Sequence, residues 1–360
     1  MALLYPWDTR LPALTGFFFS HAMTAPDRQK AATKPGLHPR NRHNKGYDFA
    51  ALTATLPDLT RFIVTTPAGT PSIDFAKPAA VKVLNRALLE MDYGVKNWDI
   101  PANYLCPPIP GRADVLHYLA DLLAESNGGQ IPHGDRLWIL DIGIGANAVY
   151  PLIGHAEYGW SFLGVDTDVK ALENVKRIVA ANPGLQYAID LRHQPVADNV
   201  FTGLLKAGEK FDLTLCNPPF HASAAEAAAA SQRKWKNLGK AHKGNPTPRN
   251  NFGGQSNELW YPGGEWAFLE RMIEQSLPIG KRCLWFTSLV SKAENLRYAE
   301  AALAKLHPCD VRIIPMSQGQ KQSRLVAWTF LSKAERMNWR KSRWPDPDQG
   351  SSQGSLVSPD

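Results

Sequence analysis

Apolar residues recur along the chain with two spacings in turn, and this alternation predicts helices and strands that follow one another. From residue 111 onward, stretches with apolar positions three or four residues apart are separated by short apolar runs typical of buried strands. The spacing predicts helices over Arg112–Ala124, Ala146–Gly154 (shortened or kinked by Pro151), Val169–Ala181, Glu265–Leu277 and Ala293–Leu306. It predicts strands over Leu137–Asp141, Trp160–Val165, Gln186–Leu191, Phe211–Cys216, Arg282–Ser288, Val311–Pro315 and Arg324–Leu331.

This order of elements indicates an α/β fold with a mostly parallel sheet. Strands separated by helices require right-handed crossovers, which place the strands in parallel. The last two strands are joined by a short turn, so we expect them to form an antiparallel hairpin at one edge. The pattern is that of a class I, Rossmann-like methyltransferase with a seven-stranded sheet over residues 111–331.

The rest of the chain divides by composition. Residues 1–36 are predicted to be a disordered leader, and residues 332–360, rich in Pro, Asp, Gln, Gly and Ser, a disordered tail. Residues 37–110 are predicted to form a small accessory module. The module has helical spacing at Asp48–Leu56 and Pro78–Met91 and a proline-rich connector at Pro101–Pro110. Residues 222–261 interrupt the alternation and are predicted to be a mobile, basic insertion loop that grips the substrate.

Composition and charge narrow the class of protein. Hydrophobic residues make up 44% and charged residues 20% of the chain, and no apolar run is long enough to span a bilayer, so we expect no membrane partner. The four cysteines lie far apart without a CxxC pair, and the histidines show no metal-ligand spacing. We therefore expect a cytoplasmic protein with reduced thiols and no metal. The net charge of +7 is concentrated in residues 28–45 and 233–249, which suits a polyanionic partner or two solvated loops.

A glycine-rich turn follows the first predicted strand of the sheet. Asp141, Gly143 and Gly145 form a D-x-G-x-G pattern, with Asn147 shortly after it. Glycines at this place permit a tight turn and close approach of a ligand, and ligands of open α/β sheets bind at the carboxyl ends of strands. The pattern differs from the G-x-G-x-x-G of dinucleotide sites, where a pyrophosphate must be held. We therefore assign these residues to S-adenosylmethionine, whose charged amino acid part needs acceptors and backbone donors.

Two further residues complete the predicted cofactor site. Asp166 ends the second strand, where an acid can accept hydrogen bonds from both hydroxyls of an adenosine ribose. Asp168, two residues later, is interpreted instead as the N-cap of the next helix. Arg112, at the start of the helix before the sheet, can pair with the carboxylate of the cofactor.

The tetrapeptide Asn217, Pro218, Pro219 and Phe220 follows the fourth strand and is the predicted catalytic motif. An amino group attached to an aromatic ring is a poor nucleophile because its lone pair is delocalised. The side-chain oxygen of Asn217 and the carbonyl of Pro218 can accept both amine hydrogens and turn the lone pair toward a methyl donor. Phe220 can stack on the base. Positioning and electrostatics, not a strong general base, are then the expected source of catalysis.

A family resemblance adds to this interpretation. Leu37–His43, with Tyr47–Ala50 after it, resembles the opening of the RlmF-like family, the bacterial 23S ribosomal RNA adenine-N6 methyltransferases. The resemblance includes Asp141–Asn147, Tyr150–Leu152, Asn217–Phe220, Gly263–Glu265 and Gln318–Gln320, and covers roughly residues 37–331. The eukaryotic U6 small nuclear RNA adenine-N6 methyltransferase is similar, more distantly, over the same core.

The resemblance implies methylation of one adenine of 23S ribosomal RNA, adenine 1618, for which the family is named. The partner would be 23S rRNA or a large-subunit assembly intermediate, and we expect a monomer. In the eukaryotic relative an arginine before the sheet contacts the cofactor carboxylate and an acid contacts the ribose; Arg112 and Asp166 match these positions. The accessory module and the insertion are expected to bind RNA, and we assign that role to Arg40, Arg42, Lys45, Arg233, Lys234 and Lys236.

Other functions remain open from the residues alone. A protein glutamine-N5 methyltransferase also uses Asn-Pro-Pro followed by an aromatic residue, typically Tyr, where this chain has Phe220. A non-catalytic RNA-binding protein on the same fold is a second alternative, although Asp141, Gly143, Asp166 and Asn217 are all intact. An NAD-dependent oxidoreductase fits poorly, because the glycine pattern differs.

Overall fold

The computed structural model describes residues 36–229, 256–318 and 321–344. The predicted leader except its last residue, the centre of the insertion and the end of the tail lie outside them. The accessory module contains α1 (Phe49–Thr55) and α2 (Pro78–Tyr93), at the two places with helical spacing. It also contains η1 (Arg42–Lys45), η2 (Pro57–Phe62), β1 (Ile63–Thr65) and β2 (Pro71–Ile73).

The remaining elements alternate as the apolar spacing predicts. The helices are α3 (Ile109–Glu125), α4 (Val149–Tyr158), α5 (Val169–Ala180), α6 (Leu185–Ala188), α8 (Ser256–Leu259), α9 (Gly264–Ser276), η4 (Leu277–Ile279), α10 (Ala293–Leu306) and α11 (Lys333–Arg343). The strands are β3 (Trp138–Ile142), β4 (Ser161–Asp166), β5 (Ile189–His193), β6 (Phe211–Cys216), β7 (Cys283–Val290), β8 (Asp310–Gln318) and β9 (Lys321–Thr329).

Seven strands form one sheet in the order β5-β4-β3-β6-β7-β9-β8. The pairs β5–β4, β4–β3, β3–β6 and β6–β7 are parallel, and β9 is antiparallel to both β7 and β8. The predicted seven-stranded, mostly parallel sheet with an antiparallel hairpin at one edge is thereby confirmed. The short strands β1 and β2 form a separate antiparallel pair in the accessory module.

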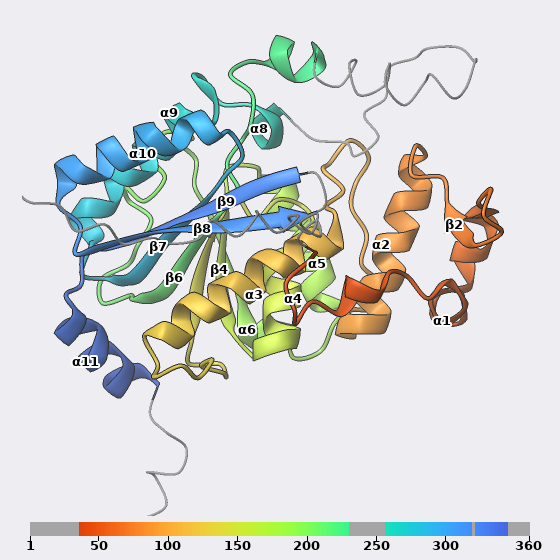
Figure 1. Cartoon of the computed structure of the whole chain (residues 1–360), viewed down its shortest axis with the longest axis horizontal. Helices are drawn as coiled ribbons and strands as arrows, with labels where there is room; N and C mark the ends of the chain where they lie inside the picture. The colour runs from red at the N-terminus through yellow and green to blue at the C-terminus, as the bar shows by residue number, and fades with distance from the viewer. Residues whose placement is uncertain (1–35, 230–255, 319–320, 345–360) are drawn as a thin grey trace, which may run out of the picture. The chain divides into compact units, whose positions relative to one another are not determined.

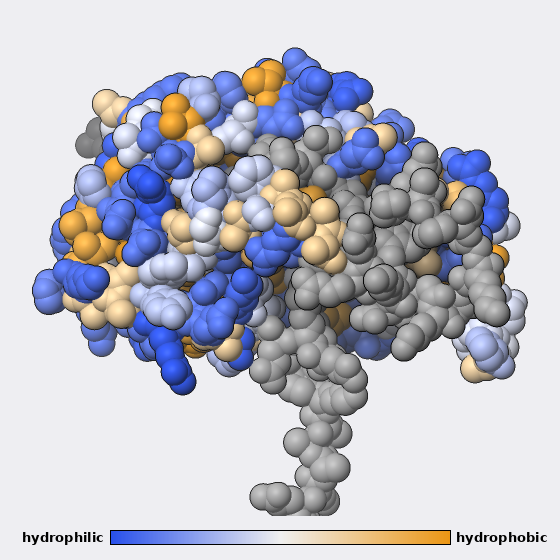
Figure 2. Space-filling model, turned by 90° about the horizontal axis from the view of Figure 1, so that it is seen from above, coloured by the Kyte–Doolittle hydropathy of each residue, from blue (hydrophilic) through white to orange (hydrophobic). Residues whose placement is uncertain are grey.

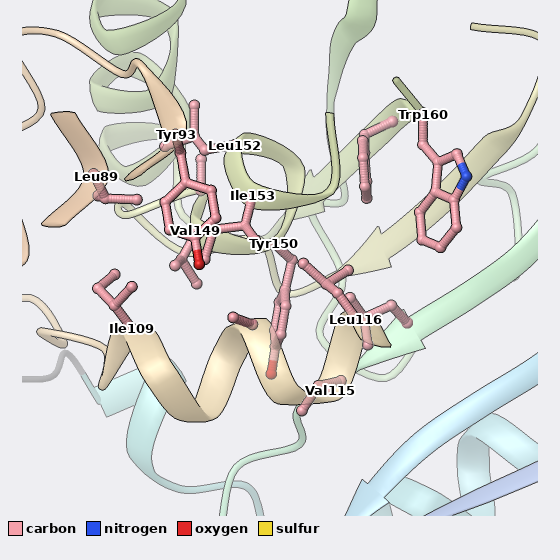
Figure 3. Close-up of a cluster of buried hydrophobic side chains, with 14 of the residues drawn as sticks. Leu89, Tyr93, Ile109, Val115, Leu116, Val149, Tyr150, Leu152, Ile153 and Trp160 are labelled. Carbon is pink, nitrogen blue, oxygen red and sulfur yellow. The ribbon is translucent and has the colours of Figure 1, made fainter. Parts of the chain in front are cut away.

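Helices cover both faces of the sheet (Figure 1). On β3 the side chains alternate between two cores: Ile139 belongs to the cluster that contains residues of α3 and α4, and Leu140 to the cluster with α9 and α10. The first cluster also includes residues of α1 and α2. Figure 3 shows Leu89 and Tyr93 of α2 beside residues of α4. The accessory module therefore shares a hydrophobic core with the helices on one face of the sheet.

The strand register places the carboxyl ends of three strands side by side. Ile142, the last residue of β3, pairs with Val165 on β4 and with Cys216 on β6. The residues that follow these three positions therefore leave the sheet side by side at its carboxyl edge. Because the chain passes from β3 to β4 on one side and later to β6 on the other, this edge is a topological switch point, where open α/β sheets bind ligands.

Two of the predicted boundaries are wrong. The strand predicted from Gln186 begins at Ile189, because the residues before it form the short helix α6. The helix expected to be shortened or kinked by Pro151 begins at Val149 and runs to Tyr158. Pro151 is its third residue, in the first turn, where backbone N–H groups have no acceptor within the helix, so the ring is tolerated.

The predicted disordered tail also needs correction for residues 332–344, since these include helix α11. Ser332 begins the helix with a capping box, in which its hydroxyl accepts from the backbone of Glu335 and the Glu335 carboxylate accepts from the backbone of Ser332. Trp339 on the inner face of α11 is 6% exposed. Composition averaged over the whole tail concealed this single amphipathic helix.

A buried carboxylate holds α11 against the amino end of β6. Asp212 is fully buried, and one of its oxygens accepts hydrogen bonds from the indoles of Trp339 and Trp344 at 2.7 and 3.0 Å. Arg343 donates to both oxygens at 2.9 and 3.0 Å, and the backbone of Trp138 adds a fourth donor group. A buried charge is stable when it is paired and fully hydrogen-bonded, as here.

Hydrophilic residues predominate on the face shown in Figure 2, among those that the structure describes. The more exposed large hydrophobic side chains, such as Phe75, Tyr187 and Tyr298, lie on separate parts of the fold. In the described part of the chain, no helix combines the length and the apolar character that a membrane span requires.

We expect Arg343→Met to lower the free energy of unfolding by about 3 kcal/mol, because it leaves the Asp212 charge buried without a counter-ion. In an Asp212→Asn background the same substitution should cost much less, since no buried charge remains. Urea unfolding of the four proteins in this cycle measures the coupling. Lys341→Met, an exposed change in the same turn, is the control. If the losses in unfolding free energy from the substitutions at Arg343 and Asp212 simply add in the double variant, the two side chains do not stabilise the fold as an ion pair.

Candidate active site

A cavity of about 310 Å³ opens at the carboxyl ends of β3, β4 and β6. Its wall comes from the connector before α3, the turn after β3, the loop after β5 and the segment where the insertion returns. Of the residues that the sequence assigned to the cofactor and to catalysis, seven line it: Arg112, Gly143, Gly145, Asn147, Asp166, Asn217 and Pro219. The tertiary structure thus brings together residues that are up to 107 positions apart in the chain.

Backbone hydrogen bonds hold the glycine turn against β4. The N–H groups of Gly143 and Ile144 both donate to the carbonyl of Val165, at 2.9 and 3.0 Å. Gly143 and Gly145 have φ angles of 76° and 63°, in the left-handed region that strains other residues. The two glycines are therefore required by the backbone, and they leave bare peptide groups on the cavity wall.

Asp166 links the end of β4 to this turn. Its two oxygens accept hydrogen bonds from the backbone N–H of Gly145 at 2.8 Å and of Asp168 at 2.9 Å. Burial raises the pKa of Asp166, and the backbone hydrogen bonds oppose that rise. Asp168 caps α5 by accepting from the N–H of Lys170, so its interpretation as an N-cap is confirmed. A carboxylate has about four acceptor positions, so Asp166 can still accept hydroxyl groups from a ligand.

Asp141 lies behind the cavity wall rather than on it. Its side chain is 1% exposed, and neither oxygen has a hydrogen-bond partner among the described residues. Burial raises the pKa of Asp141 to about 8, the charge of Asp166 adds to the rise, and the charge of Arg112 opposes it. A buried carboxylate without a partner is unusual and costly, and it is complementary to a cationic ligand group.

Arg112 reaches the cavity from the first turn of α3. Its guanidinium donates to the hydroxyl of Tyr150 at 2.7 Å and lies 5.4 Å from the centre of that ring. Figure 3 shows Tyr150 pointing from α4 toward α3. Burial raises the pKa of Tyr150 to about 12, so the hydroxyl stays protonated at neutral pH. A neutral phenol orients the guanidinium without neutralising it, which leaves its charge available for a carboxylate.

The tetrapeptide after β6 borders two cavities. Asn217 lines the larger cavity and also a smaller one of about 50 Å³, which Arg112 shares. Pro219 lines the larger cavity and Phe220 the smaller one, whereas Pro218 is buried and lines neither. No hydrogen bond joins the Asn217 amide to another side chain or backbone group in the described part of the chain. Its donors and acceptor are therefore available for a ligand.

Sequence reasoning missed three parts of the wall. Leu105 and Pro107 of the connector line the larger cavity, as do Gln194 of the loop after β5 and Glu258 and Trp260 where the insertion returns. The backbone of His221 pairs with residues 259 and 261 in an isolated bridge, which closes the base of the insertion beside the tetrapeptide. No local sequence pattern identifies these residues, because they reach the cavity only when segments distant in the sequence come together in the fold.

The connector is also joined to the glycine turn. The Asn147 side chain donates to the carbonyl of Leu105 at 3.5 Å and accepts from the N–H of Val149 at 3.1 Å. The indole of Trp98 donates to the carbonyl of Asn147 at 2.9 Å. Asn147 thus holds the connector over the cavity, in addition to lining it.

The residues assigned to RNA binding are placed differently from one another. Arg40 pairs with Asp121 at 2.8 Å, and Arg42 with Glu157 at 2.6 Å. These contacts dock the start of the accessory module on α3 and α4. Lys45 in η1 is exposed. The basic residues of the insertion, Arg233, Lys234 and Lys236, lie outside the described residues. Among the described side chains, no group of three or more His, Cys, Asp or Glu is placed to hold a metal ion.

The chain is similar to known proteins over most of its length. A family model described as RNA methyltransferase matches residues 31–332. The ribosomal RNA large subunit methyltransferase F of Dechloromonas aromatica is 63% identical over 310 residues, which cover 86% of this chain and 91% of that protein. The protein of the same name from Ectopseudomonas mendocina is 59% identical over 321 residues, 89% of this chain and 96% of that protein.

Solved structures show the same fold. The catalytic domain of hMettl16, in complex with MAT2A 3′UTR hairpin 1, matches with a TM-score of 0.69 and 28% identity over 82% of this chain and 96% of that one. The N-terminal domain of human METTL16, in complex with SAH, matches with a TM-score of 0.64 and 27% identity, over 83% of this chain and 100% of that one.

We expect Asp141 to make the ligand-free protein progressively less stable as the pH rises from about 4 to about 8. Because folding raises the pKa of Asp141 from its ordinary value of about 4 to about 8, the folded state keeps a proton that the unfolded chain releases. The contribution of Asp141 to the free energy of unfolding is fully present below pH 4. It is lost as the pH rises through 8, by at most about 1.4 kcal/mol per pH unit. Asp141→Asn should flatten this decline in urea unfolding, and Asp135→Asn, at an exposed acid, should not. An unchanged decline in Asp141→Asn would refute the assignment.

Proposed function

The chain belongs to the RNA methyltransferase family whose model matches it, and we propose that it methylates N6 of one adenine in 23S ribosomal RNA. Adenine 1618 is the position implied by the family. One observation carries the proposal: Asn217 borders both cavities, with Pro219 on one side and Phe220 on the other. A base beside Phe220 would present its amino group to Asn217 at the edge of the larger cavity.

S-adenosylmethionine is the methyl donor, and it supplies a methyl group on a positively charged sulfur. Three residues of this chain suit its parts. The charge of Arg112 suits the carboxylate, and the partnerless carboxylate of Asp141 suits the ammonium group. Asp166, which keeps acceptor positions after two backbone bonds, suits the ribose hydroxyls. The orphaned oxygens of Asp141 are the feature of this structure that best fits such a ligand.

Asn217 prepares the amine for transfer. Its side-chain oxygen and the carbonyl of Pro218 accept the two amine hydrogens, which favours a pyramidal nitrogen with its lone pair directed at the methyl group. Proline fixes φ at both positions 218 and 219, so the carbonyl of Pro218 moves little. Phe220 stacks on the base. The smaller cavity, at about 50 Å³, is tighter than an adenine requires, so the base enters as the side chains lining it move apart.

The alternatives find less support. A glutamine-N5 methyltransferase has no need of basic segments, and the relatives at 63% and 59% identity are named ribosomal RNA methyltransferases. A binding protein without activity would have no reason to keep a buried, unsatisfied Asp141, because such a group costs stability.

The proposal extends to partner and location. The substrate is 23S rRNA or a large-subunit assembly intermediate, met in the cytoplasm by a monomer. We assign phosphate contacts to Lys45, Arg233, Lys234 and Lys236. Arg40 and Arg42 are removed from that set, because their ion pairs with Asp121 and Glu157 already use their charges.

Asn217→Ala should reduce methyl transfer at least a hundredfold and leave binding of S-adenosylhomocysteine within about twofold, because the amide acts on the substrate amine. Asn217→Asp keeps an acceptor oxygen and should retain more activity. The assay is transfer of tritiated methyl to rRNA from a strain that lacks this protein, followed by nucleoside analysis. Label in N6-methyladenosine is expected. Full turnover by Asn217→Ala would exclude this mechanism, and label confined to protein would favour the glutamine alternative.

Replacing Arg233, Lys234 and Lys236 by Ala should weaken RNA binding and reduce the slope of log affinity against log salt by about 2, for three lost phosphate contacts at about 0.7 each. The matched control is Arg42→Ala, whose charge is already paired with Glu157 and whose loss should leave the slope unchanged. Filter binding from 50 to 300 mM salt gives both slopes. If Arg42→Ala flattens the slope and the triple variant does not, then Arg42 contacts the RNA phosphates and the three residues of the insertion do not.

A further inference from the structure

The insertion returns to the fold through α8, and the side chain of Glu258 enters the wall of the cofactor cavity. Its carboxylate accepts a hydrogen bond of 3.1 Å from the backbone N–H of Leu105, which lines the same cavity from the connector. An acidic group from the insertion and a peptide group from the connector thus meet at this place. The function proposed above gives this carboxylate no role.

The carboxylate of Glu258 lies close to Gly145 in the turn after β3. A Cβ atom built on Gly145 would lie 3.4 Å from Oε1 of Glu258, while the N–H of the same glycine donates to Asp166 at 2.8 Å. The carboxylates of Glu258 and Asp166 therefore approach one glycine from two directions. Both line the cavity.

The interactions of Tyr104, in the connector, indicate that Glu258 lies near the end of β4. The Tyr104 hydroxyl donates to Asp168 at 2.6 Å, just beyond that strand. Burial raises the pKa of Tyr104, and the charges of Asp168, Glu258 and Asp166 raise it further. Glu258 therefore lies near enough to Tyr104 for its charge to act on the phenol, close to the end of β4 to which the cofactor ribose is assigned.

We propose that Glu258 is a second ribose ligand of S-adenosylmethionine, contributed by the insertion. The proposal rests on the function given above. A ribose carries two neighbouring hydroxyls, and Asp166 already uses two of its acceptor positions on backbone N–H groups. A second carboxylate within reach of Gly145 accepts a hydroxyl in a charge-assisted hydrogen bond, which is about twice as strong as a neutral one.

The assignment also links the cofactor to the substrate side of the site. Glu258 lies two residues before Trp260, which pairs with His221 in the bridge directly after the catalytic tetrapeptide. Backbone hydrogen bonds of 3.1 and 3.0 Å make this bridge. A bound ribose that holds Glu258 therefore also holds the segment that flanks Phe220.

Binding of two ligands tests the proposal directly. Isothermal titration with S-adenosylhomocysteine and with 5′-methylthioadenosine, which keeps the ribose but lacks the amino acid part, is carried out on the intact protein, Glu258→Gln and Glu226→Gln. We expect Glu258→Gln to weaken both ligands by about tenfold or more, since one hydrogen bond to a charged group is lost. Glu226→Gln is the control: Glu226 lies at the other end of the insertion, contacts Ala222 and His221 instead of the connector, and lines neither cavity.

A second readout tests the link to the substrate side. S-adenosylhomocysteine should slow hydrogen exchange at residues 258–261 and at His221 in the intact protein and less so in Glu258→Gln. The Gln side chain can still accept from Leu105, so the ligand-free variant should melt with the intact protein. Unchanged affinity in Glu258→Gln overturns the proposal. So does a loss confined to S-adenosylhomocysteine, which would place Glu258 on the ammonium group. Failure of the intact protein to bind either ligand would instead overturn the proposed function itself.

Discussion

The whole site depends on a few hydrogen bonds that hold the turn after β3 against the end of β4. Two N–H groups, from Gly143 and Ile144, share the carbonyl of Val165, and the N–H of Gly145 donates to Asp166. The sheet register ends β3, β4 and β6 in one row, and the larger cavity opens at the carboxyl ends of these strands. Residues of α3, the connector and the insertion also line it.

Two buried carboxylates of the same sheet differ in how completely their oxygens are hydrogen-bonded. Asp212, at the amino end of β6, receives hydrogen bonds from the indoles of Trp339 and Trp344 and from Arg343. Its charge is satisfied, and it fastens α11. Asp141, at the carboxyl end of β3, is equally buried and has no partner among the described residues. A buried polar group without a partner costs stability, and this one lies at the end of the sheet where the larger cavity opens.

The start of the accessory module shows that residues of a basic segment can also form contacts within the folded chain. The run from His38 to His43 is basic and suits a polyanion. In the folded protein the backbone N–H of His38 and the side chain of Asn41 donate to Asp114 on α3, and Arg42 pairs with Glu157 on α4. These basic and polar groups serve packing between the module and the sheet domain. The two share one hydrophobic core, so the module is built into the catalytic domain and not attached to it.

The sequence alone determined the order of elements, the parallel sheet with its edge hairpin, and a site at the ends of β3, β4 and β6, because apolar periodicity and local motifs such as Asn217–Phe220 are short-range signals. It misplaced the start of β5 and missed α11, since helix α6 and a single capped helix are too short to dominate an average. Only the tertiary structure showed that Glu258 and Leu105 line the larger cavity, that Arg343 pairs with Asp212, and that the arginines after His38 form ion pairs. These contacts join residues tens to more than a hundred positions apart, and no local pattern encodes which distant side chain a buried or charged group will meet.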